Sequence, residues 1–302
     1  MVFPGQGSQS PGMQADLAER YSVVRRTYAE ASDVLGYDLW ARVQEGPADK
    51  LAETTVTQPA MLAAGVAAWR AWIEAGGEWP ALVSGHSLGE YSALVCADAI
   101  DFAEAMAVVK RRAELMQEAV PAGQGAMAAI LGLEDDIVGE VCAAVAGVAE
   151  PVNYNSPGQV VIAGETAAIN AAVERAKEKG ARRAIVLPVS VPSHSSLMRG
   201  AGEALAATLA GAGFRDPAIT VVSAATAAPY GGADDIRRLL AAQVYSPVRW
   251  TETIRAMVAA GGDRFVECGP GKVLAGLVRR IDKSLPVFSV DDYDGLQKAM
   301  AG

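Results

Sequence analysis

The residues Gly85-His86-Ser87-Leu88-Gly89 carry the strongest chemical signal in the chain. A short apolar run, Ala81-Leu82-Val83, precedes them, and a helix-forming run from Glu90 to Ala97 follows. A strand, a sharp turn and a helix form the context in which Gly-x-Ser-x-Gly places a serine hydroxyl at the top of a sheet, facing a helix N-terminus. The glycines allow a turn that is too tight for side chains. We therefore interpret Ser87 as a nucleophile, with a purely structural turn as the alternative.

A serine hydroxyl is a poor nucleophile until a nearby base takes its proton. The chain has two histidines, His86 and His194. Since His86 directly precedes Ser87, we expect its side chain to point away from the serine oxygen and to serve local packing. His194 lies in a polar loop after an expected strand, from which a side chain could reach across a cleft. We predict that His194 is the base; a structural histidine is the alternative.

Arg111 and Arg112 lie in a predicted helix after the serine motif. Consecutive helical residues point about 100° apart, so at most one of the two faces a cleft. The planar guanidinium of that residue could bind a substrate carboxylate through two charge-assisted hydrogen bonds. Met116 lies four residues after Arg112 on the same helical face and could line an acyl pocket. Two solvated charges are the alternative.

Helical and strand patterns alternate along most of the chain, which predicts a parallel sheet wrapped by helices. We expect strands over 1–3, 219–223 and 264–267, in addition to the one before Ser87. Helices are expected over 13–35, 59–74, 102–120 and 250–260.

Residues from about 125 to 189 follow the order β-α-β-β-α-β, which is typical of a ferredoxin-like domain. We therefore predict an α/β protein in which a small ferredoxin-like domain, 123–189, is inserted into a large α/β-hydrolase-like domain with a parallel-sheet core, 1–122 and 190–302. The strands are expected over 126–131, 152–154, 160–163 and 184–189, and the helices over 135–146 and 166–179.

Composition excludes several classes of protein. With 302 residues, 51% of them apolar and 20% charged, the chain can bury a large core. Its net charge of −9 argues against nucleic-acid binding, which requires clustered positive charge. The three cysteines, Cys96, Cys142 and Cys268, are far apart and are expected to be buried, reduced thiols. No basic segment precedes an apolar run at the N-terminus and no apolar run is long enough to span a bilayer, so we expect a cytoplasmic protein without membrane contact.

The order of the candidate residues bears on the class of enzyme. In α/β-hydrolases the nucleophile, the acid and the histidine follow in that order, with the histidine last. Here residues 195–302 follow His194 and carry further expected sheet and helix, whereas the residues between Ser87 and His194 are largely the small domain. A simple esterase is therefore disfavoured.

Several stretches of the sequence resemble one known protein family. Nearly end to end, the chain resembles the malonyl-CoA:acyl carrier protein transacylases of bacterial fatty acid synthesis, members of the acyltransferase family. Any one matching stretch is modest evidence, but all of them in this order are highly specific. The stretches are 3–9 (FPGQGSQ), 85–92 (GHSLGEYS), 116–120 (MQEAV), 155–164 (NSPGQVVIAG), 188–194 (PVSVPSH) and 269–274 (GPGKVL).

The resemblance implies Ser87 as nucleophile, His194 as general base and Arg112, rather than Arg111, as the ligand of the malonyl carboxylate. It also implies that the backbone N–H groups of Gln6 and Leu88 form the oxyanion hole, which suits a glycine-flanked turn and a helix start.

The group that orients His194 is given by the resemblance alone. The family suggests that the backbone carbonyl of Gln243 orients His194. The sequence itself leaves Asp263 and Glu267 as alternative orienting groups. Gln58 also matches the family, and we expect a structural role for it. Family members carry more apolar residues before Phe3, so a short first strand is expected.

The expected reaction transfers a malonyl group from malonyl-CoA to the phosphopantetheine thiol of acyl carrier protein through a malonyl-serine intermediate, in a ping-pong sequence with no metal or tightly held cofactor. We expect a monomer. Carrier proteins are acidic, so a basic patch should receive them. Arg182 and Arg183, with Lys177 and Lys179 nearby, form the densest basic cluster; a solvated helix end is the alternative.

Two rival functions stay open from the sequence. One is a discrete acyltransferase of a polyketide synthase, which could use a substituted malonyl unit. The other is a serine thioesterase or esterase, which releases its acyl group to water. Replacing Arg112 with alanine distinguishes a thioesterase or esterase from a malonyl transacylase. Only transfer of a malonyl group requires a cation that binds the free carboxylate of the acyl group.

Overall fold

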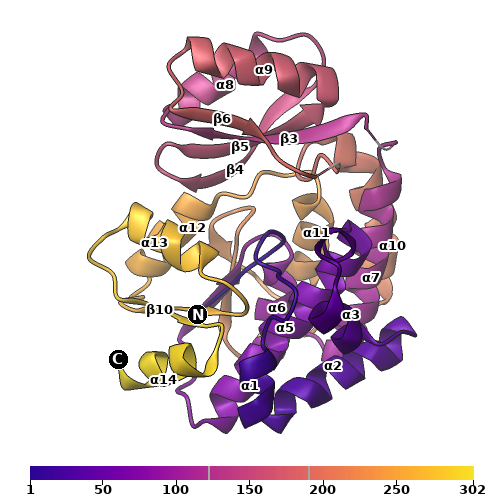
Figure 1. The fold of residues 1–302 in the computed structure, drawn as a ribbon, viewed down its shortest axis with the longest axis vertical. Helices are drawn as coiled ribbons and strands as arrows, with labels where there is room; N and C mark the ends of the chain where they lie inside the picture. The colour runs from indigo at the N-terminus through magenta and orange to yellow at the C-terminus, as the bar shows by residue number, and fades with distance from the viewer. Residues whose placement is uncertain (122, 190) are drawn as a thin grey trace.

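The computed structural model describes residues 1–121, 123–189 and 191–302, which form two sheets with their helices (Figure 1). The predicted domain boundaries fall at Ala122 and Ser190, which lie outside the described residues, so the division into domains stays a prediction. A six-stranded sheet has the order β10-β9-β1-β2-β7-β8, and a four-stranded sheet the order β4-β5-β3-β6. The strands of the larger sheet are β1 (Val2–Phe3), β2 (Leu82–Gly85), β7 (Thr220–Ser223), β8 (Ala228–Pro229), β9 (Phe265–Cys268) and β10 (Val287–Val290).

The larger sheet is parallel except at β8, which pairs with β7 in the antiparallel sense. This confirms the α/β class with a parallel core and adds two edge strands, β8 and β10, that the sequence analysis did not predict. Successive side chains of a strand face opposite sides. Accordingly, Phe3 joins the hydrophobic cluster on one face of the sheet, while Val2 joins the cluster on the other. Both faces are covered, as a parallel sheet requires.

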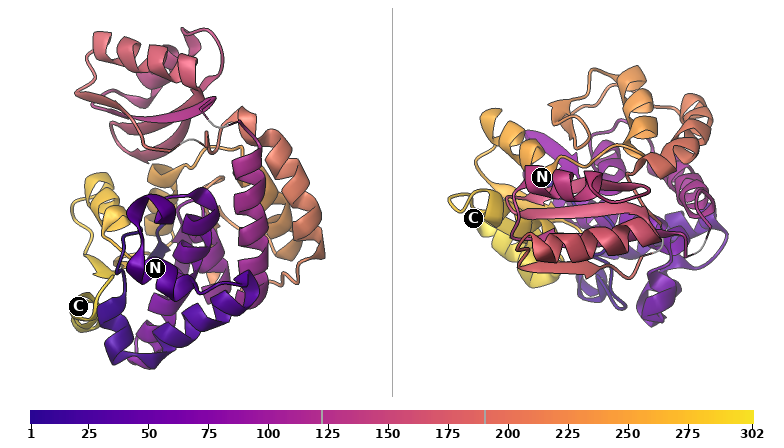
Figure 2. Two further views of the ribbon diagram at one scale, coloured as in Figure 1. Left: turned by 45° about the vertical axis from the view of Figure 1, so that its right-hand side comes forward. Right: turned by 90° about the horizontal axis from the view of Figure 1, so that it is seen from above.

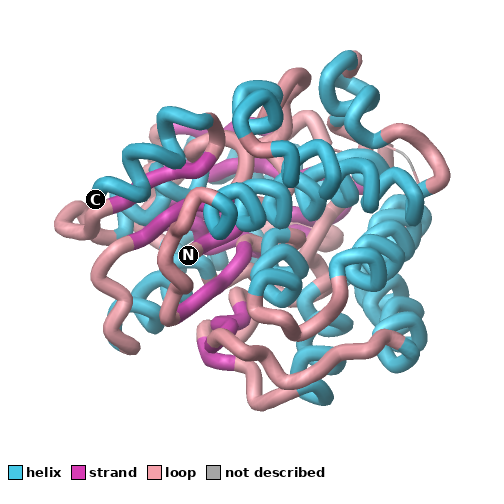
Figure 3. Tube along the Cα trace, turned by 90° about the horizontal axis from the view of Figure 1, so that it is seen from below, coloured by secondary structure: helices cyan, strands magenta, loops and turns pink. Residues whose placement is uncertain are grey.

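The two faces of this sheet carry different sets of helices. One face packs on α12 (Trp250–Ala259) and α13 (Val273–Ile281). Seen from below, the strands lie between helices (Figure 3). The helices that contribute to the other cluster are α1 (Ala15–Arg20), α2 (Ser22–Leu35), α3 (Leu39–Glu45), α4 (Ala48–Leu51), α5 (Thr54–Glu74), α6 (Gly89–Cys96), α7 (Phe102–Glu118), α10 (Arg199–Gly211), α11 (Ala233–Gln243) and α14 (Tyr293–Ala301).

The four-stranded sheet is antiparallel throughout, and its helices lie on the side away from the larger sheet (Figures 1 and 2). The element order and the strand order are those of the ferredoxin-like arrangement that the sequence predicts. Along β3, Ala128 and Ile130 pack toward the helices, whereas Met127 and Ala129 belong to a small cluster on the opposite face. The elements are β3 (Gly125–Leu131), α8 (Asp135–Ala143), β4 (Ala149–Ser156), β5 (Gln159–Glu165), α9 (Thr166–Glu178) and β6 (Arg183–Val186).

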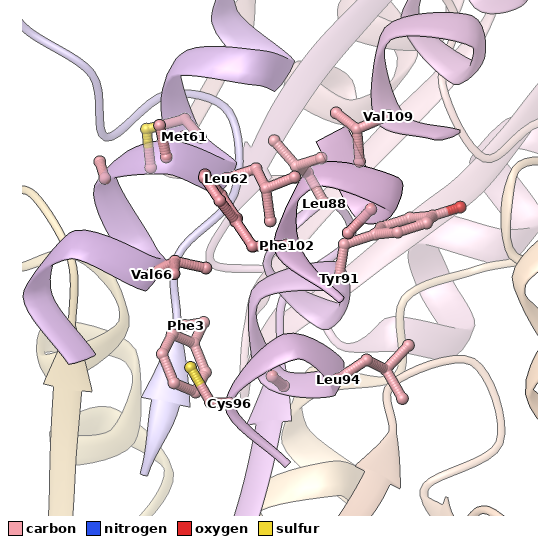
Figure 4. Close-up of a cluster of buried hydrophobic side chains, with 14 of the residues drawn as sticks. Phe3, Met61, Leu62, Val66, Leu88, Tyr91, Leu94, Cys96, Phe102 and Val109 are labelled. Atoms are coloured by element: carbon pink, nitrogen blue, oxygen red, sulfur yellow. The ribbon is translucent and has the colours of Figure 1, made fainter. Parts of the chain in front are cut away.

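A densely packed core lies behind the serine motif. Figure 4 shows Phe3, Met61, Leu62, Leu88 and Tyr91, which belong to this core and come from β1, α5 and the start of α6. All five side chains are at most 1% exposed. Burial of this kind fixes the turn that carries Ser87, because shifting any one group would open a void.

Most expected helices end one to three residues earlier in the structure than predicted, and the helices expected over 13–35 and 59–74 differ more. The helix expected over 13–35 is divided, because the backbone of Tyr21 is extended between α1 and α2. The helix expected to begin at Pro59 begins at Thr54, with Pro59 inside it. Thr57 and Gln58 are fully buried, so packing extends the helix beyond the start that the proline signal indicates. Within the three described segments, none of the helices has the length and apolar character needed to cross a bilayer.

Candidate active site

Ser87 occupies a strained turn between β2 and α6. Its φ of 52° lies in the left-handed region, which a non-glycine residue adopts rarely. The flanking glycines make the turn possible: a Cβ on Gly85 would lie 1.9 Å from the Gly89 backbone, and one on Gly89 would lie 2.1 Å from the carbonyl oxygen of Phe3. This strand-turn-helix is the arrangement that the motif predicts.

His194 lies beside the serine, although the two are 107 positions apart in sequence. Its Nε2 is 2.7 Å from Ser87 Oγ, and its Nδ1 is 2.8 Å from the carbonyl oxygen of Gln243. A carbonyl only accepts, so Nδ1 carries the proton and Nε2 is left to accept from the serine hydroxyl. The backbone N–H of His194 also donates to the carbonyl of Val244, at 3.0 Å.

The environment keeps the His194 imidazole neutral. Burial lowers its pKa to about 3, and the positive charge of Arg112 acts in the same direction, while the hydrogen bond to Gln243 opposes the shift. A neutral imidazole can accept a proton from Ser87.

Arg112 is fully buried on α7 and points at the serine. One of its terminal nitrogens donates to Ser87 Oγ at 3.3 Å and to Gln243 Oε1 at 3.0 Å; the other donates to Gln58 Oε1 at 2.5 Å. The guanidinium also lies over the Tyr91 ring, with Cζ 5.6 Å from its centroid. These partners are neutral, which leaves the positive charge available to an anion.

Arg111 and Gln58 differ in their places in the structure. Arg111 is exposed and forms an ion pair with Glu114 at 3.1 Å, so only one of the two arginines faces the serine. Gln58, for which we expected a structural role, directly contacts Arg112. The resemblance to the family pointed to Gln58, but no sequence spacing indicates that a residue of α5 contacts a residue of α7.

Two backbone N–H groups lie at the serine turn where the oxyanion hole is expected. Leu88 immediately precedes α6, and Gln6 lies in the turn after β1. A Cβ on Gly5 would be 2.5 Å from the carbonyl oxygen of His86 and 3.8 Å from the nitrogen of Leu88, so this turn lies directly on the serine turn. Among the described residues, neither the Gln6 nor the Leu88 N–H donates a hydrogen bond.

A cleft of about 400 Å³ opens onto Ser87 and His194. One wall of the cleft comes from the part of the molecule built around the six-stranded sheet and includes Gln6. The other wall comes from the face of the four-stranded sheet opposite its helices and includes Met127 and Val161. The alternation along β3 and β5 therefore supplies apolar side chains to the cleft. His86 also lines it, and its Nε2 lies 2.8 Å from Asn155 Oδ1 rather than at the serine, as expected from the sequence.

The other predicted residues lie farther from the serine. Met116 is buried with its Sδ 3.5 Å from the amide nitrogen of Gln58, and its part in an acyl pocket stays a prediction. Arg182 and Arg183 are exposed at the start of β6. Glu267 accepts from the backbone of Leu274 and Ala275 and so is engaged away from His194.

Cysteine thiols and clusters of potential metal ligands are two further kinds of reactive group. All three cysteines are free and buried, as expected. The described part of the chain holds no cluster of histidine, cysteine and carboxylate side chains that could bind a metal ion.

Comparison with known proteins assigns the family. A family model described as the acyl transferase domain matches residues 1–294. The malonyl CoA-acyl carrier protein transacylase of Escherichia coli (strain K12) is 50% identical over 301 residues, covering 99% of this chain and 97% of the relative. The chain belongs to the malonyl-CoA:acyl carrier protein transacylase family.

Solved structures of this family are similar over the whole chain. A malonyl-transacylase in complex with a holo type II PKS acyl-carrier protein is 52% identical, with a TM-score of 0.98, covering 100% of this chain and 98% of that one. An acyl carrier protein S-malonyltransferase from Vibrio cholerae is 55% identical, with a TM-score of 0.95 and 98% of each chain covered.

Proposed function

We propose that this chain transfers the malonyl group from malonyl-CoA to the phosphopantetheine thiol of acyl carrier protein, and so supplies fatty acid biosynthesis. One observation carries the residue roles: Ser87 Oγ lies within hydrogen-bonding distance of both the His194 imidazole and the Arg112 guanidinium. A base and a cation at one hydroxyl suit a nucleophile that accepts an anionic acyl group.

In the first half-reaction, Ser87 Oγ attacks the thioester carbonyl of malonyl-CoA while its proton passes to His194 Nε2. The tetrahedral intermediate places its negative oxygen at the N–H groups of Gln6 and Leu88. The carbon–sulfur bond then breaks, His194 returns the proton to the departing sulfur of coenzyme A, and malonyl-Ser87 is left.

The second half-reaction runs these steps in reverse with a new thiol. His194 removes the proton of the phosphopantetheine thiol, whose sulfur attacks the ester carbonyl of malonyl-Ser87. The carbon–oxygen bond breaks, Ser87 Oγ regains the proton from His194, and malonyl carrier protein leaves. No metal or tightly held cofactor takes part.

Arg112 accounts for the choice of an acyl group with a free carboxylate. Malonyl is a short unit, so its carboxylate stays near the serine to which it is bound, and Arg112 lies there with only neutral partners. A bidentate guanidinium–carboxylate pair in a buried site is strong and directional.

The carrier is proposed to dock at the basic cluster at the start of β6. Lys177 and Lys179 of this cluster form ion pairs with Glu174 and Glu140, at 2.7 and 3.9 Å. Arg182 and Arg183 form no ion pair with any described residue and are exposed, so their charges are available to an acidic partner. A cytoplasmic, monomeric enzyme is consistent with this activity.

The second candidate function keeps the chemistry and changes the carrier. The similarity to a transacylase bound to a type II PKS acyl-carrier protein favours service to a polyketide synthase as the alternative. Rates with the two kinds of carrier, and with malonyl-CoA against methylmalonyl-CoA, distinguish the two.

Intact-mass spectrometry tests the proposal. Incubation with malonyl-CoA is expected to add one malonyl group to the wild-type chain and none to Ser87→Ala, and holo carrier protein should then discharge it. Loss of the adduct to water at the same rate with and without carrier would instead indicate a thioesterase.

A further inference from the structure

Glu90 is a fully buried carboxyl group, three residues after the nucleophile, that the mechanism above does not use. Burial raises its pKa, and hydrogen bonds from Tyr230 and Gln243 oppose that shift. Tyr230 Oη donates to Glu90 Oε1 and Gln243 Nε2 donates to Glu90 Oε2, each at 2.5 Å. A buried carboxyl is costly unless such partners satisfy it, so its presence beside the nucleophile calls for a role.

The Gln243 side chain lies between Glu90 and the active site. Its Nε2 also donates to the carbonyl oxygen of Ser87 at 3.0 Å, while its Oε1 accepts from Arg112 at 3.0 Å. An amide has distinct donor and acceptor ends. With Glu90 and the Ser87 carbonyl both taking its N–H groups, the oxygen end is held toward the guanidinium.

The backbone of the same residue holds His194, whose Nδ1 donates to the Gln243 carbonyl at 2.8 Å. Gln243 is 1% exposed and thus connects the nucleophile, the base and the cation within the core. A group that fixes the Gln243 side chain therefore fixes one of the acceptors that orient Arg112.

We propose that Glu90 is a positioning residue that acts through the Gln243 amide to place Arg112, and thereby sets the preference of the site for acyl groups with a free carboxylate. This inference rests on the proposed function. A carboxylate in direct contact with Arg112 would compete with the malonyl group for the guanidinium. Glu90 reduces this competition because the Gln243 amide lies between it and Arg112, so its charge acts on the guanidinium only from a distance.

The test compares kcat/KM for acylation of Ser87 by malonyl-CoA and by acetyl-CoA, whose ratio measures the use of the carboxylate. Glu90→Leu retains the volume of the side chain and removes the acceptor of the Gln243 N–H group. The malonyl-to-acetyl ratio is expected to fall about tenfold, because one well-placed hydrogen bond is lost. Glu90→Gln can present its amide oxygen to Gln243 and should restore the ratio to within about threefold of wild type.

Tyr230→Phe is the matched control, because it removes the other hydrogen bond of Glu90 and leaves the one to Gln243. It is expected to lower the melting temperature and leave the ratio unchanged. If Glu90→Leu does not fold, Glu90→Asp takes its place, since it withdraws the carboxylate from Gln243 and should lower the ratio.

The outcomes separate this inference from the proposed function. A ratio that is unchanged in the folded Glu90 variant, or that falls equally in Tyr230→Phe, overturns the positioning role while the wild-type malonyl adduct still supports transacylation. Absence of that adduct in the wild-type chain overturns both.

Discussion

The carbonyl oxygen of Gln243, the last residue of α11, lies 2.8 Å from His194 Nδ1. In a serine-histidine-aspartate triad a carboxylate occupies this position. Here a carbonyl at the carboxyl end of a helix does so; it also accepts from the backbone N–H of Ser246 at 3.3 Å, and the partial negative charge at this end of the helix favours a nearby cation. In the proposed mechanism this carbonyl, rather than a carboxylate in direct contact with His194, stabilises the imidazolium.

The pH dependence of acylation follows from the state of His194. Burial and Arg112 lower its pKa to about 3, so the base is neutral throughout the ordinary range. We predict that kcat/KM for malonylation of Ser87 stays constant from about pH 8 to about pH 5. Rapid-quench mass spectrometry of the adduct provides the measurement. A decline with a midpoint near 6.5, the ordinary value for histidine, would contradict the prediction.

The same shift predicts a change in stability with pH. The folded-state pKa of about 3 lies below the ordinary value of 6.5, so between these values the unfolded chain binds more protons. The free energy of unfolding therefore falls as the pH falls through this window. Burial also lowers the pKa of His86, which adds a slope of the same sign. Denaturant titrations at several pH values should show that the free energy of unfolding changes less with pH in His194→Gln than in wild type.

Replacing Arg112 should separate binding of the carboxylate from the chemistry of acyl transfer. Arg112→Ala is expected to reduce kcat/KM for malonyl-CoA by roughly a hundredfold, about 3 kcal/mol, because charged hydrogen bonds to the acyl carboxylate are lost. Acetyl-CoA, which has no such carboxylate, should be affected far less. Arg111→Ala is the matched control, since that side chain pairs with Glu114 at the surface. Equal losses with both thioesters would argue against the carboxylate role.

The contact between the Gly5 turn and the serine turn predicts a catalytic defect from one methyl group. In Gly5→Ala the new Cβ would meet the His86 carbonyl oxygen at 2.5 Å, which must push the Gln6 N–H away from Ser87. Loss of one oxyanion donor costs about 3 kcal/mol of transition-state stabilisation, so kcat for acylation should fall by roughly a hundredfold. Gly200→Ala in α10, which has open space around it, is the control and should retain full activity.

Local signals in the sequence predicted those parts of the site that lie within one turn or carry a distinctive side chain. Ser87 follows from the glycines that its turn requires, and His194 from the scarcity of histidines. Gln243 was implied by resemblance alone, because a backbone carbonyl has no residue type and Asp263 and Glu267 looked equally possible from the residues.

Other features depend on tertiary packing, which short-range patterns do not record. Gln58 joins Arg112 across 54 residues and Glu90 joins Gln243 across 153, so neither contact has a spacing signature. The early start of α5 likewise reflects burial of Thr57 and Gln58, which outweighs the proline signal at Pro59. Both Ser87 and His194 have positive φ, at 52° and 68°, and such strain at non-glycine residues persists only where the surroundings enforce it.

Charge reversal at the start of β6 tests the docking surface. The double variant Arg182→Glu/Arg183→Glu should raise the apparent KM for holo carrier protein, because two exposed cations at the proposed docking surface become anions and repel an acidic carrier. The malonylation of Ser87 by malonyl-CoA alone should be unchanged, since the cleft is intact. Salt should weaken carrier transfer in the wild type more than in the variant.

The matched control reverses the same number of charges on another surface. Arg25→Glu/Arg26→Glu alters α2, in the larger part of the molecule and away from the four-stranded sheet (Figure 1). It should leave the carrier KM near the wild-type value. A similar rise in both double variants would show that overall charge, rather than a surface at β6, governs the encounter. An unchanged KM in the β6 variant would place the carrier elsewhere on the protein.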